Sequence, residues 1–167
     1  MVPLEIYLHI PFCVRKCRYC DFLSAPANKE VQDAYTRALR QEIRNFSAVK
    51  DYQVETVFLG GGTPSLLSGD TVFELLEELR NRFPFSADPE ITIECNPGTA
   101  DREKLVRYRE AGINRLSLGL QSADNRELAL LGRIHTWESF LETYDQAREA
   151  GFSRPPSRPA SRARSVS

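Results

Sequence analysis

The feature that most restricts the fold of this 167-residue chain is a short apolar stretch followed by an amphipathic helix, repeated in order along the sequence. Alternating or continuous apolar residues predict strands at 4–10, 56–59, 91–94 and 116–120. Apolar residues spaced by three and four predict helices at 31–46, 70–83, 101–111, 124–131 and 137–150. Strands that alternate with helices favour a parallel sheet with helices outside it, so the fold class is α/β.

Single residues predict where several elements begin and end. The run Thr56–Leu59 is continuous and apolar, which is typical of a parallel strand covered on both faces. Asp70 is expected to cap the second helix, and Gly112 and Gly151 are expected to end the third and the last. The side chains expected on the buried face of the second helix are Val72, Phe73, Leu76, Leu79 and Phe83.

The length of the chain limits how much of a barrel it can form. A complete barrel of β-α units needs on the order of 200 residues or more, so residues 1–152 are expected to form the first four units of a partial TIM-type barrel. The fifteen residues at 153–167 contain only Ser, Arg, Pro, Ala and one Val and cannot cover a core. They form either a flexible basic tail or a frameshifted, non-native end, and the abrupt change in composition favours the second interpretation.

Charge and hydropathy give further expectations. The 22 basic and 23 acidic residues nearly cancel, so the net charge of -1 gives no electrostatic reason to expect nucleic acid or an anionic membrane as a partner. No apolar run approaches the roughly 20 residues of a membrane-spanning helix. The first residues lack the basic and apolar regions of a signal peptide, so we expect a cytoplasmic location. There, the four cysteines are expected to be thiols or metal ligands.

Three of the cysteines follow the first expected strand. Cys13, Cys17 and Cys20 lie within eight residues, and three thiolates on one loop can hold one metal centre. A [4Fe–4S] cluster normally takes four thiolates, so three would leave one iron open to a substrate or cofactor. The same spacing is compatible with zinc, with His9 as a fourth ligand, or with unligated thiols. Cys95, in the third strand, is expected to be a buried apolar residue.

The Cys-x3-Cys-x2-Cys loop directly after the first strand resembles that of the radical S-adenosylmethionine superfamily. Over residues 4–152 the chain also resembles the oxygen-independent coproporphyrinogen III oxidase family. The segments that carry this second resemblance are YLHIPFC at 7–13, FLGGGTPS at 58–65, ECNP at 94–97, LGLQS at 118–122 and LGRIH at 131–135. Their order, with one β-α unit between neighbours, makes the set far more specific than any single segment.

The resemblance implies two cofactors, a [4Fe–4S] cluster on the three cysteines and S-adenosylmethionine. It also implies the reductive cleavage of S-adenosylmethionine to methionine and a 5′-deoxyadenosyl radical. The residues that fall on cofactor-contacting positions are Tyr7, Tyr19, Gly61, Gly62, Thr63, Glu94, Gln121 and Arg133. Most of them close strands, and parallel α/β folds bind ligands beyond the carboxyl ends of their strands.

Several of these residues also have a simpler interpretation. The glycines after the second strand are also typical of a tight turn. Glu94 and Gln121 are also what a solvent-facing strand end would carry, and Arg133 is also consistent with a solvated side chain. The aspartate that the family uses at the end of a fifth strand has no counterpart here.

One position separates two groups within the family. The oxidases carry an additional cysteine two places after the third, where this chain has Phe22. The chain therefore resembles the haem chaperone subgroup, whose members bind haem and pass it to haem-requiring enzymes. This implies haem, or a porphyrin precursor, and a haem-accepting protein as partners of the full-length protein.

The region that carries the haem-binding motif of these chaperones is absent. We assign haem to neither His9 nor His135, and we expect both to be hydrogen-bonded or exposed. The other hypotheses are an oxidase acting on coproporphyrinogen III, a zinc-stabilised binding module, and an inactive fragment.

Overall fold

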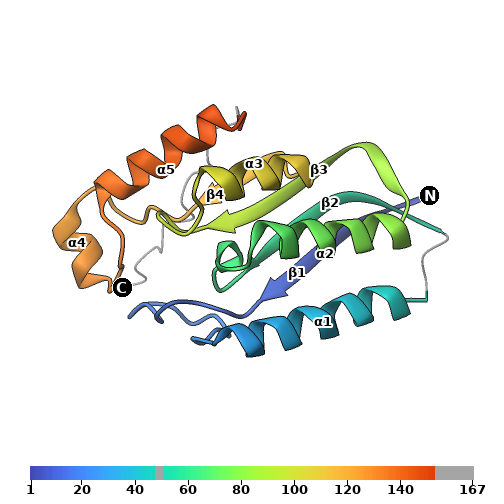
Figure 1. Ribbon diagram of the computed structural model, residues 1–167, viewed down its shortest axis with the longest axis horizontal. Coiled ribbons are helices and arrows are strands. Elements are labelled where there is room, and N and C mark those ends of the chain that lie inside the picture. The colour runs from blue at the N-terminus through green and yellow to red at the C-terminus, as the bar shows by residue number, and fades with distance from the viewer. Residues whose placement is uncertain (48–50, 153–167) are drawn as a thin grey trace, which may run out of the picture.

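The sheet of this protein contains four parallel strands in the order β1-β2-β3-β4 (Figure 1). The structure, a computed structural model, describes residues 1–47 and 51–152, so the predicted tail at 153–167 lies outside the described residues. The strands are β1 (Val2–Ile10), β2 (Tyr52–Gly61), β3 (Phe85–Cys95) and β4 (Arg115–Leu118). This arrangement confirms the parallel α/β architecture predicted from the sequence.

The helices follow the strands in the predicted order. They are α1 (Lys29–Asn45), α2 (Gly69–Arg82), α3 (Arg102–Glu110), α4 (Asn125–Leu130) and α5 (Trp137–Glu149), with a short 3-10 turn, η1 (Pro64–Leu66), before α2. In Figure 1, α1, α2 and α3 lie side by side along the sheet, and α5 packs next to α3. No helix among the described residues combines the length and the apolar character needed to cross a membrane.

The predicted cap of α2 is wrong. The helix begins earlier, because the Oγ of Ser68 accepts a hydrogen bond from the backbone N–H of Thr71 at 3.1 Å. Asp70 lies within the first turn, where its carboxylate is favoured by the helix dipole. It also accepts a hydrogen bond from Arg107 Nε of α3 at 2.8 Å. Serine and aspartate are both good capping residues, so local sequence did not distinguish between them.

Three predicted strand lengths are also wrong. β2 spans Tyr52–Gly61 and not only 56–59, because the polar residues Gln53 and Glu55 interrupt the apolar run in its first half. β3 begins at Phe85 and includes Asp88 and Pro89, whose types are depleted in strands, so the pattern alone indicated only its second half. β4 ends at Leu118 and not at 120. The chain turns immediately afterwards, and Gln121 has a φ of 70° that no regular strand contains.

The core lies between the helices and one face of the sheet. Strand residues on that face are fully or nearly fully buried, and they include Leu8, Ile10, Val57, Leu59, Ile91, Ile93, Leu116 and Leu118. The opposite face carries Tyr7, which is 55% exposed, stacked at 5.9 Å on the partly exposed Phe58. The prediction that the second strand is covered on both faces is therefore wrong for the described residues.

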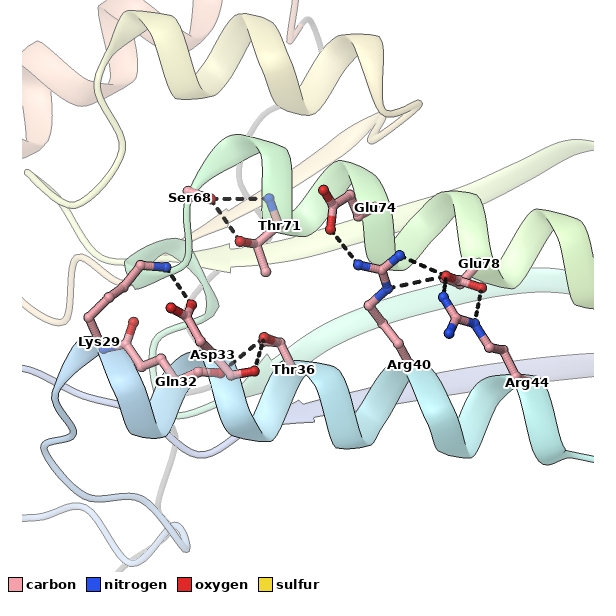
Figure 2. A network of polar contacts seen from close by, with 10 residues as sticks. All are labelled: Lys29, Gln32, Asp33, Thr36, Arg40, Arg44, Ser68, Thr71, Glu74 and Glu78. Atoms are coloured by element: carbon pink, nitrogen blue, oxygen red, sulfur yellow. Dashed lines mark hydrogen bonds and ion pairs between the residues drawn. The ribbon is translucent and has the colours of Figure 1, made fainter.

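Helix α2 is held on the sheet by its apolar face and on α1 by ion pairs. Val72, Leu76, Leu79 and Phe83 are buried as predicted, and the partly buried Phe73 lies 3.8 Å below the guanidinium of Arg107. On the neighbouring side, two arginines of α1 contact two glutamates of α2 (Figure 2). The four residues of this network are Arg40, Arg44, Glu74 and Glu78.

Candidate functional site

The three cysteines lie in the segment between β1 and α1, and all three are half-buried. This segment turns back on itself through two backbone bonds, from the N–H of Cys13 to the carbonyl of Ala25 at 3.2 Å and from the N–H of Ala25 to the carbonyl of Pro11 at 2.9 Å. A tighter turn is closed by the N–H of Cys20 and the carbonyl of Cys17 at 3.1 Å. The backbone therefore brings the three thiols onto one compact loop.

The cysteine loop is anchored to the end of β2. The N–H of Gly62 donates to the carbonyl of Ile10 at 2.8 Å, and the N–H of Thr63 donates to the carbonyl of Phe12 at 2.6 Å. The approach is close, because a Cβ on Gly62 would lie only 2.4 Å from the carbonyl oxygen of Phe12. Glycine is therefore required there by contact with the loop, in addition to any turn that it forms.

The loop is also anchored to the segment between α4 and α5. The backbone N–H of Arg18 donates to the carbonyl of Leu131 at 3.2 Å. The Nη2 of Arg15 donates to the carbonyl of Gly132 at 2.9 Å. These contacts join parts of the chain more than 100 residues apart, so the position of the thiols depends on the whole described fold.

A cavity of about 480 Å³ lies between the cysteine loop and the carboxyl ends of β2, β3 and β4. This volume falls in the range of sites for small molecules and cofactors. The three cysteines line it together with seven of the eight predicted cofactor residues, namely Tyr19, Gly61, Gly62, Thr63, Glu94, Gln121 and Arg133. Tyr7 does not line it. Its side chain lies on the open face of the sheet, with the hydroxyl 3.4 Å from Nδ1 of His9.

Glu94 supplies the carboxylate of this cavity. One of its oxygens accepts a hydrogen bond from the backbone N–H of Gly61 at 3.2 Å. Burial raises the pKa of Glu94, and the Gly61 hydrogen bond partly opposes this rise. A half-buried carboxylate with one protein donor has further acceptor sites, and these suit an ammonium group or hydroxyls of a ligand.

Arg133 joins the cysteine loop to two strand ends. Its Nη1 lies 3.6 Å from Sγ of Cys17 and 3.4 Å from the hydroxyl of Tyr19. Its Nη2 donates to Oδ1 of Asn96 at 2.7 Å and to the carbonyl of Gly119 at 2.8 Å. The guanidinium is therefore engaged by the protein on both sides, and the interpretation of Arg133 as a freely solvated side chain does not hold.

Asn96 is a site residue that the sequence interpretation did not select. Its Nδ2 donates to Oγ1 of Thr63 at 2.8 Å, so one amide bridges the end of β2 and Arg133. The sequence did contain an indication of this role. Asn96 follows Glu94 by two residues, and side chains two apart in a strand share a face, so both could have been expected at the same site. Asn96 lies just after the strand, however, and its partners are distant in sequence.

Gln121 lies in the turn after β4, which ends at Leu118, and not at the strand end that the sequence predicted, and it lines the cavity. Among the described residues it is the one non-glycine residue with a positive φ, at 70°. Such a conformation costs on the order of 1 kcal/mol and occurs most often at turns and ligand sites. Gln121 therefore borders the cavity from a turn and not from a regular strand.

The two histidines are hydrogen-bonded, in agreement with the prediction. His9 Nε2 lies 3.1 Å from the carbonyl oxygen of Leu23, and its Nδ1 faces Tyr7. Both nitrogens therefore have partners, which disfavours His9 as a fourth ligand for zinc. His135 is buried, with Nε2 3.1 Å from the carbonyl oxygen of Leu120, and burial lowers its pKa.

The donor set fits an iron–sulfur cluster. In the described ranges 1–47 and 51–152, no three His, Cys, Asp or Glu side chains are gathered around the position of a single ion. Cys13, Cys17 and Cys20 border one cavity from one loop, and thiolates are the ligands that iron–sulfur clusters take. Cys95, 2% exposed, is buried as predicted, and burial raises its pKa to about 12.

Comparison with known proteins agrees with this geometry. The family model described as the Radical SAM superfamily matches residues 7–157. The chain is 49% identical over 135 residues to the haem chaperone HemW of Escherichia coli (strain K12), covering 80% of this chain and 36% of that protein. It is 41% identical over 144 residues to the mouse protein named radical S-adenosyl methionine domain-containing protein 1, mitochondrial, covering 86% of this chain and 33% of that protein.

A solved structure shares the fold. Coproporphyrinogen III oxidase (HemN) of Escherichia coli, described as a radical SAM enzyme, has a TM-score of 0.82 and 34% sequence identity. The match covers 91% of this chain and 36% of that one, which supports the partial TIM-type barrel predicted from the sequence. The chain thus spans well under half the length of the relatives that it matches. A superfamily model that covers most of the chain, together with the shared β-α order and the cysteine loop, shows that the chain belongs to the radical SAM superfamily.

Proposed function

We propose that this chain binds a [4Fe–4S] cluster through Cys13, Cys17 and Cys20 and binds S-adenosylmethionine in the adjoining cavity. The observation that carries the proposal is that one cavity is bordered by the three thiols and by the ends of three parallel strands. When both groups are bound, they supply the reductive cleavage of a sulfur–carbon bond. The chain's own residues bind and orient the cofactor and limit the access of water.

Individual residues have separate roles in this proposal. Gly61 and Gly62 leave the backbone accessible at the end of β2. Glu94 accepts hydrogen bonds from the ammonium group or the ribose hydroxyls, and Gln121 offers both a donor and an acceptor. Tyr19, Thr63 and Arg133 complete the wall. Tyr7 lies outside the cavity, so its contact with the cofactor stays a prediction from the resemblance.

For the full-length protein we infer delivery of haem to haem-requiring enzymes. Two observations support this over oxidase activity. Relatives from Escherichia coli and Haemophilus influenzae, 49% and 36% identical, are named haem chaperones. Phe22 also occupies the place of the additional cysteine of the oxidases. The haem-accepting protein and the cytoplasmic location belong to the same proposal.

The second candidate is an oxidase acting on coproporphyrinogen III. The observation that favours it is the fold shared with HemN at a TM-score of 0.82. The full-length homologous protein distinguishes the two, because an oxidase decarboxylates coproporphyrinogen III, whereas a chaperone activates a haem-free acceptor enzyme. Porphyrin turnover in that protein would replace the haem-delivery proposal.

The cofactor proposal is tested by anaerobic reconstitution of the 167-residue chain with iron and sulfide, followed by electron paramagnetic resonance (EPR) of the reduced sample. We expect a [4Fe–4S] signal that changes when S-adenosylmethionine is added, because the cofactor binds the open iron. A soluble, monodisperse sample that holds one zinc ion and no cluster would contradict the proposal. A cluster signal that S-adenosylmethionine does not alter would retain the cluster but reject the cofactor site.

A further inference from the structure

We propose that Asn96 is a positioning residue that holds Arg133 against Cys17, so that the arginine sets the reduction potential of the cluster. The inference rests on the proposed function, because it requires a cluster bound to Cys17. It adds a role that the predicted cofactor contacts do not include. Arg133 acts on a cluster ligand, and Asn96 acts through Arg133.

The first step is the direction of the guanidinium. A guanidinium is a planar, rigid fork, so fixing one of its terminal nitrogens fixes the direction of the other. Nη2 of Arg133 is fixed by Oδ1 of Asn96 at 2.7 Å and by the carbonyl of Gly119 at 2.8 Å. Nη1 then points to the cysteine loop, where Sγ of Cys17 lies at 3.6 Å. A longer distance is normal for a hydrogen bond to sulfur than for one to oxygen.

The second step is the orientation of the Asn96 amide. Its Nδ2 donates to Oγ1 of Thr63 at 2.8 Å, and Thr63 is 4% exposed. Its backbone carbonyl accepts from both the N–H of Thr99, at 3.1 Å, and the hydroxyl of Thr99, at 2.7 Å. The donor end of the amide therefore faces Thr63, and the acceptor end is left for Arg133. Hydrogen bonds therefore hold both the backbone and the side chain of Asn96 in place.

The third step is the absence of a side chain at Gly119. A Cβ there would lie 2.9 Å from Oδ1 of Asn96 and 3.3 Å from Nη2 of Arg133. Glycine at this position lets the arginine–asparagine pair rest directly on the end of β4. The pair would otherwise be displaced from the cysteine loop.

The electrostatic consequence follows from the charge of the arginine. Reduction adds negative charge to the cluster and its thiolates, and a cationic hydrogen-bond donor at a ligand sulfur stabilises the reduced form. Arg133 is partly buried, so its charge is screened less than that of an exposed arginine. Arg133 therefore raises the reduction potential and makes the cluster easier to reduce.

The test is a redox titration of the reconstituted chain, monitored by EPR in the absence of S-adenosylmethionine, so that any contact with the cofactor does not contribute. We expect Arg133→Gln to lower the equilibrium constant for reduction about tenfold, which corresponds to about 59 mV for one electron. Asn96→Ala should shift the potential in the same direction by a smaller amount. In the Arg133→Gln background, Asn96→Ala should add no further shift, because Asn96 acts through the arginine.

Arg18→Gln is the matched control. It removes the same charge from an exposed residue directly beside Cys17, and a distinctly smaller shift is expected. Equal potentials in the parent, Arg133→Gln and Asn96→Ala would overturn the inference, as would a shift in Arg18→Gln as large as that in Arg133→Gln. If Arg133→Gln does not retain the cluster, Asn96→Ala decides, and a potential equal to that of the parent in this variant rejects the inference. A parent chain without a cluster would instead contradict the proposed function.

Discussion

The guanidinium Nη1 of Arg133 lies 3.6 Å from Sγ of Cys17, although 116 residues separate them along the chain. The backbone supports this contact, because the N–H of Arg18 donates to the carbonyl of Leu131 in the same region. On its other side the cysteine loop is bonded to Thr63 at the end of β2. Assembly of the cluster site therefore depends on correct folding of distant segments, and cluster content reports on the tertiary structure.

The cysteine assignment predicts different results for two classes of cysteine. Cys17→Ser should lower the cluster content per chain at least tenfold, because a hydroxyl is a poor ligand for iron in such a cluster. Cys95→Ala should retain the cluster and lower the free energy of unfolding by about 1 kcal/mol, because it leaves a small gap in the core. Iron and sulfide analysis after reconstitution measures both. Loss of the cluster in the folded Cys95→Ala protein would show that the ligand set is wrong.

A methyl group at residue 62 should disturb the site more than the core. In Gly62→Ala the new Cβ meets the backbone of Phe12, with the carbonyl oxygen 2.4 Å away, so the cysteine loop must move from the end of β2. We expect cluster incorporation to fall several-fold, with a loss of stability of about 1–3 kcal/mol. Gly98→Ala is the control, because its added methyl group meets no atom within 4 Å, while its φ of 78° imposes a backbone strain that Gly62→Ala does not have. Equal cluster loss in both variants would mean that general destabilisation is the cause.

The ion-pair network between α1 and α2 predicts a pH dependence of stability (Figure 2). Hydrogen bonds from Arg44 and then from Arg40 lower the pKa of Glu78 from its ordinary 4.5 to about 2. A lowered pKa in the folded state means that the stabilisation is present above pH 4.5 and is lost as the pH falls toward about 2. At neutral pH, Glu78→Gln should lower the free energy of unfolding by about 1 kcal/mol, and this difference from the parent should vanish in acid.

Urea unfolding of the parent and Glu78→Gln at several pH values measures this difference. Glu74→Gln is the matched control, since Glu74 is 53% exposed and, among the described residues, forms an ion pair with Arg40 only, and its effect should be smaller. A Glu78→Gln effect that stays constant from neutral pH to acid would show that charge is not its origin.

Two tyrosine substitutions should change stability in opposite directions. Tyr108 is fully buried, and its hydroxyl has no hydrogen-bond partner within the described part of the chain. Tyr108→Phe removes this unsatisfied group and should raise the free energy of unfolding by about 1 kcal/mol. Tyr35 donates to the carbonyl of His9 at 2.6 Å, so Tyr35→Phe should lower it by about 1 kcal/mol. Thermal unfolding distinguishes the two, and a Tyr108→Phe protein that melts below the parent would indicate a partner for the hydroxyl.

Local sequence predicted the order of the elements and most of their ends. Asp101 and Asp124 cap α3 and α4, and Gly112 and Gly151 follow α3 and α5 with positive φ values. These features depend on residues three or four positions apart, which a pattern reveals directly. The start of α2 was predicted wrongly, because two capping residues stand within three positions and only the tertiary contact of Asp70 with Arg107 separates their roles.

The fold class, the superfamily and the three thiols on one loop could all be predicted before folding was considered, since each follows from spacing along the chain. Tertiary structure alone decided which face of the sheet Tyr7 occupies and that Asn96 joins Thr63 to Arg133. The physical reason is that side-chain direction within a strand follows from the register and from the exact strand end. A hydrogen bond between residues 37 positions apart depends on how three strand ends meet. No local periodicity contains that information.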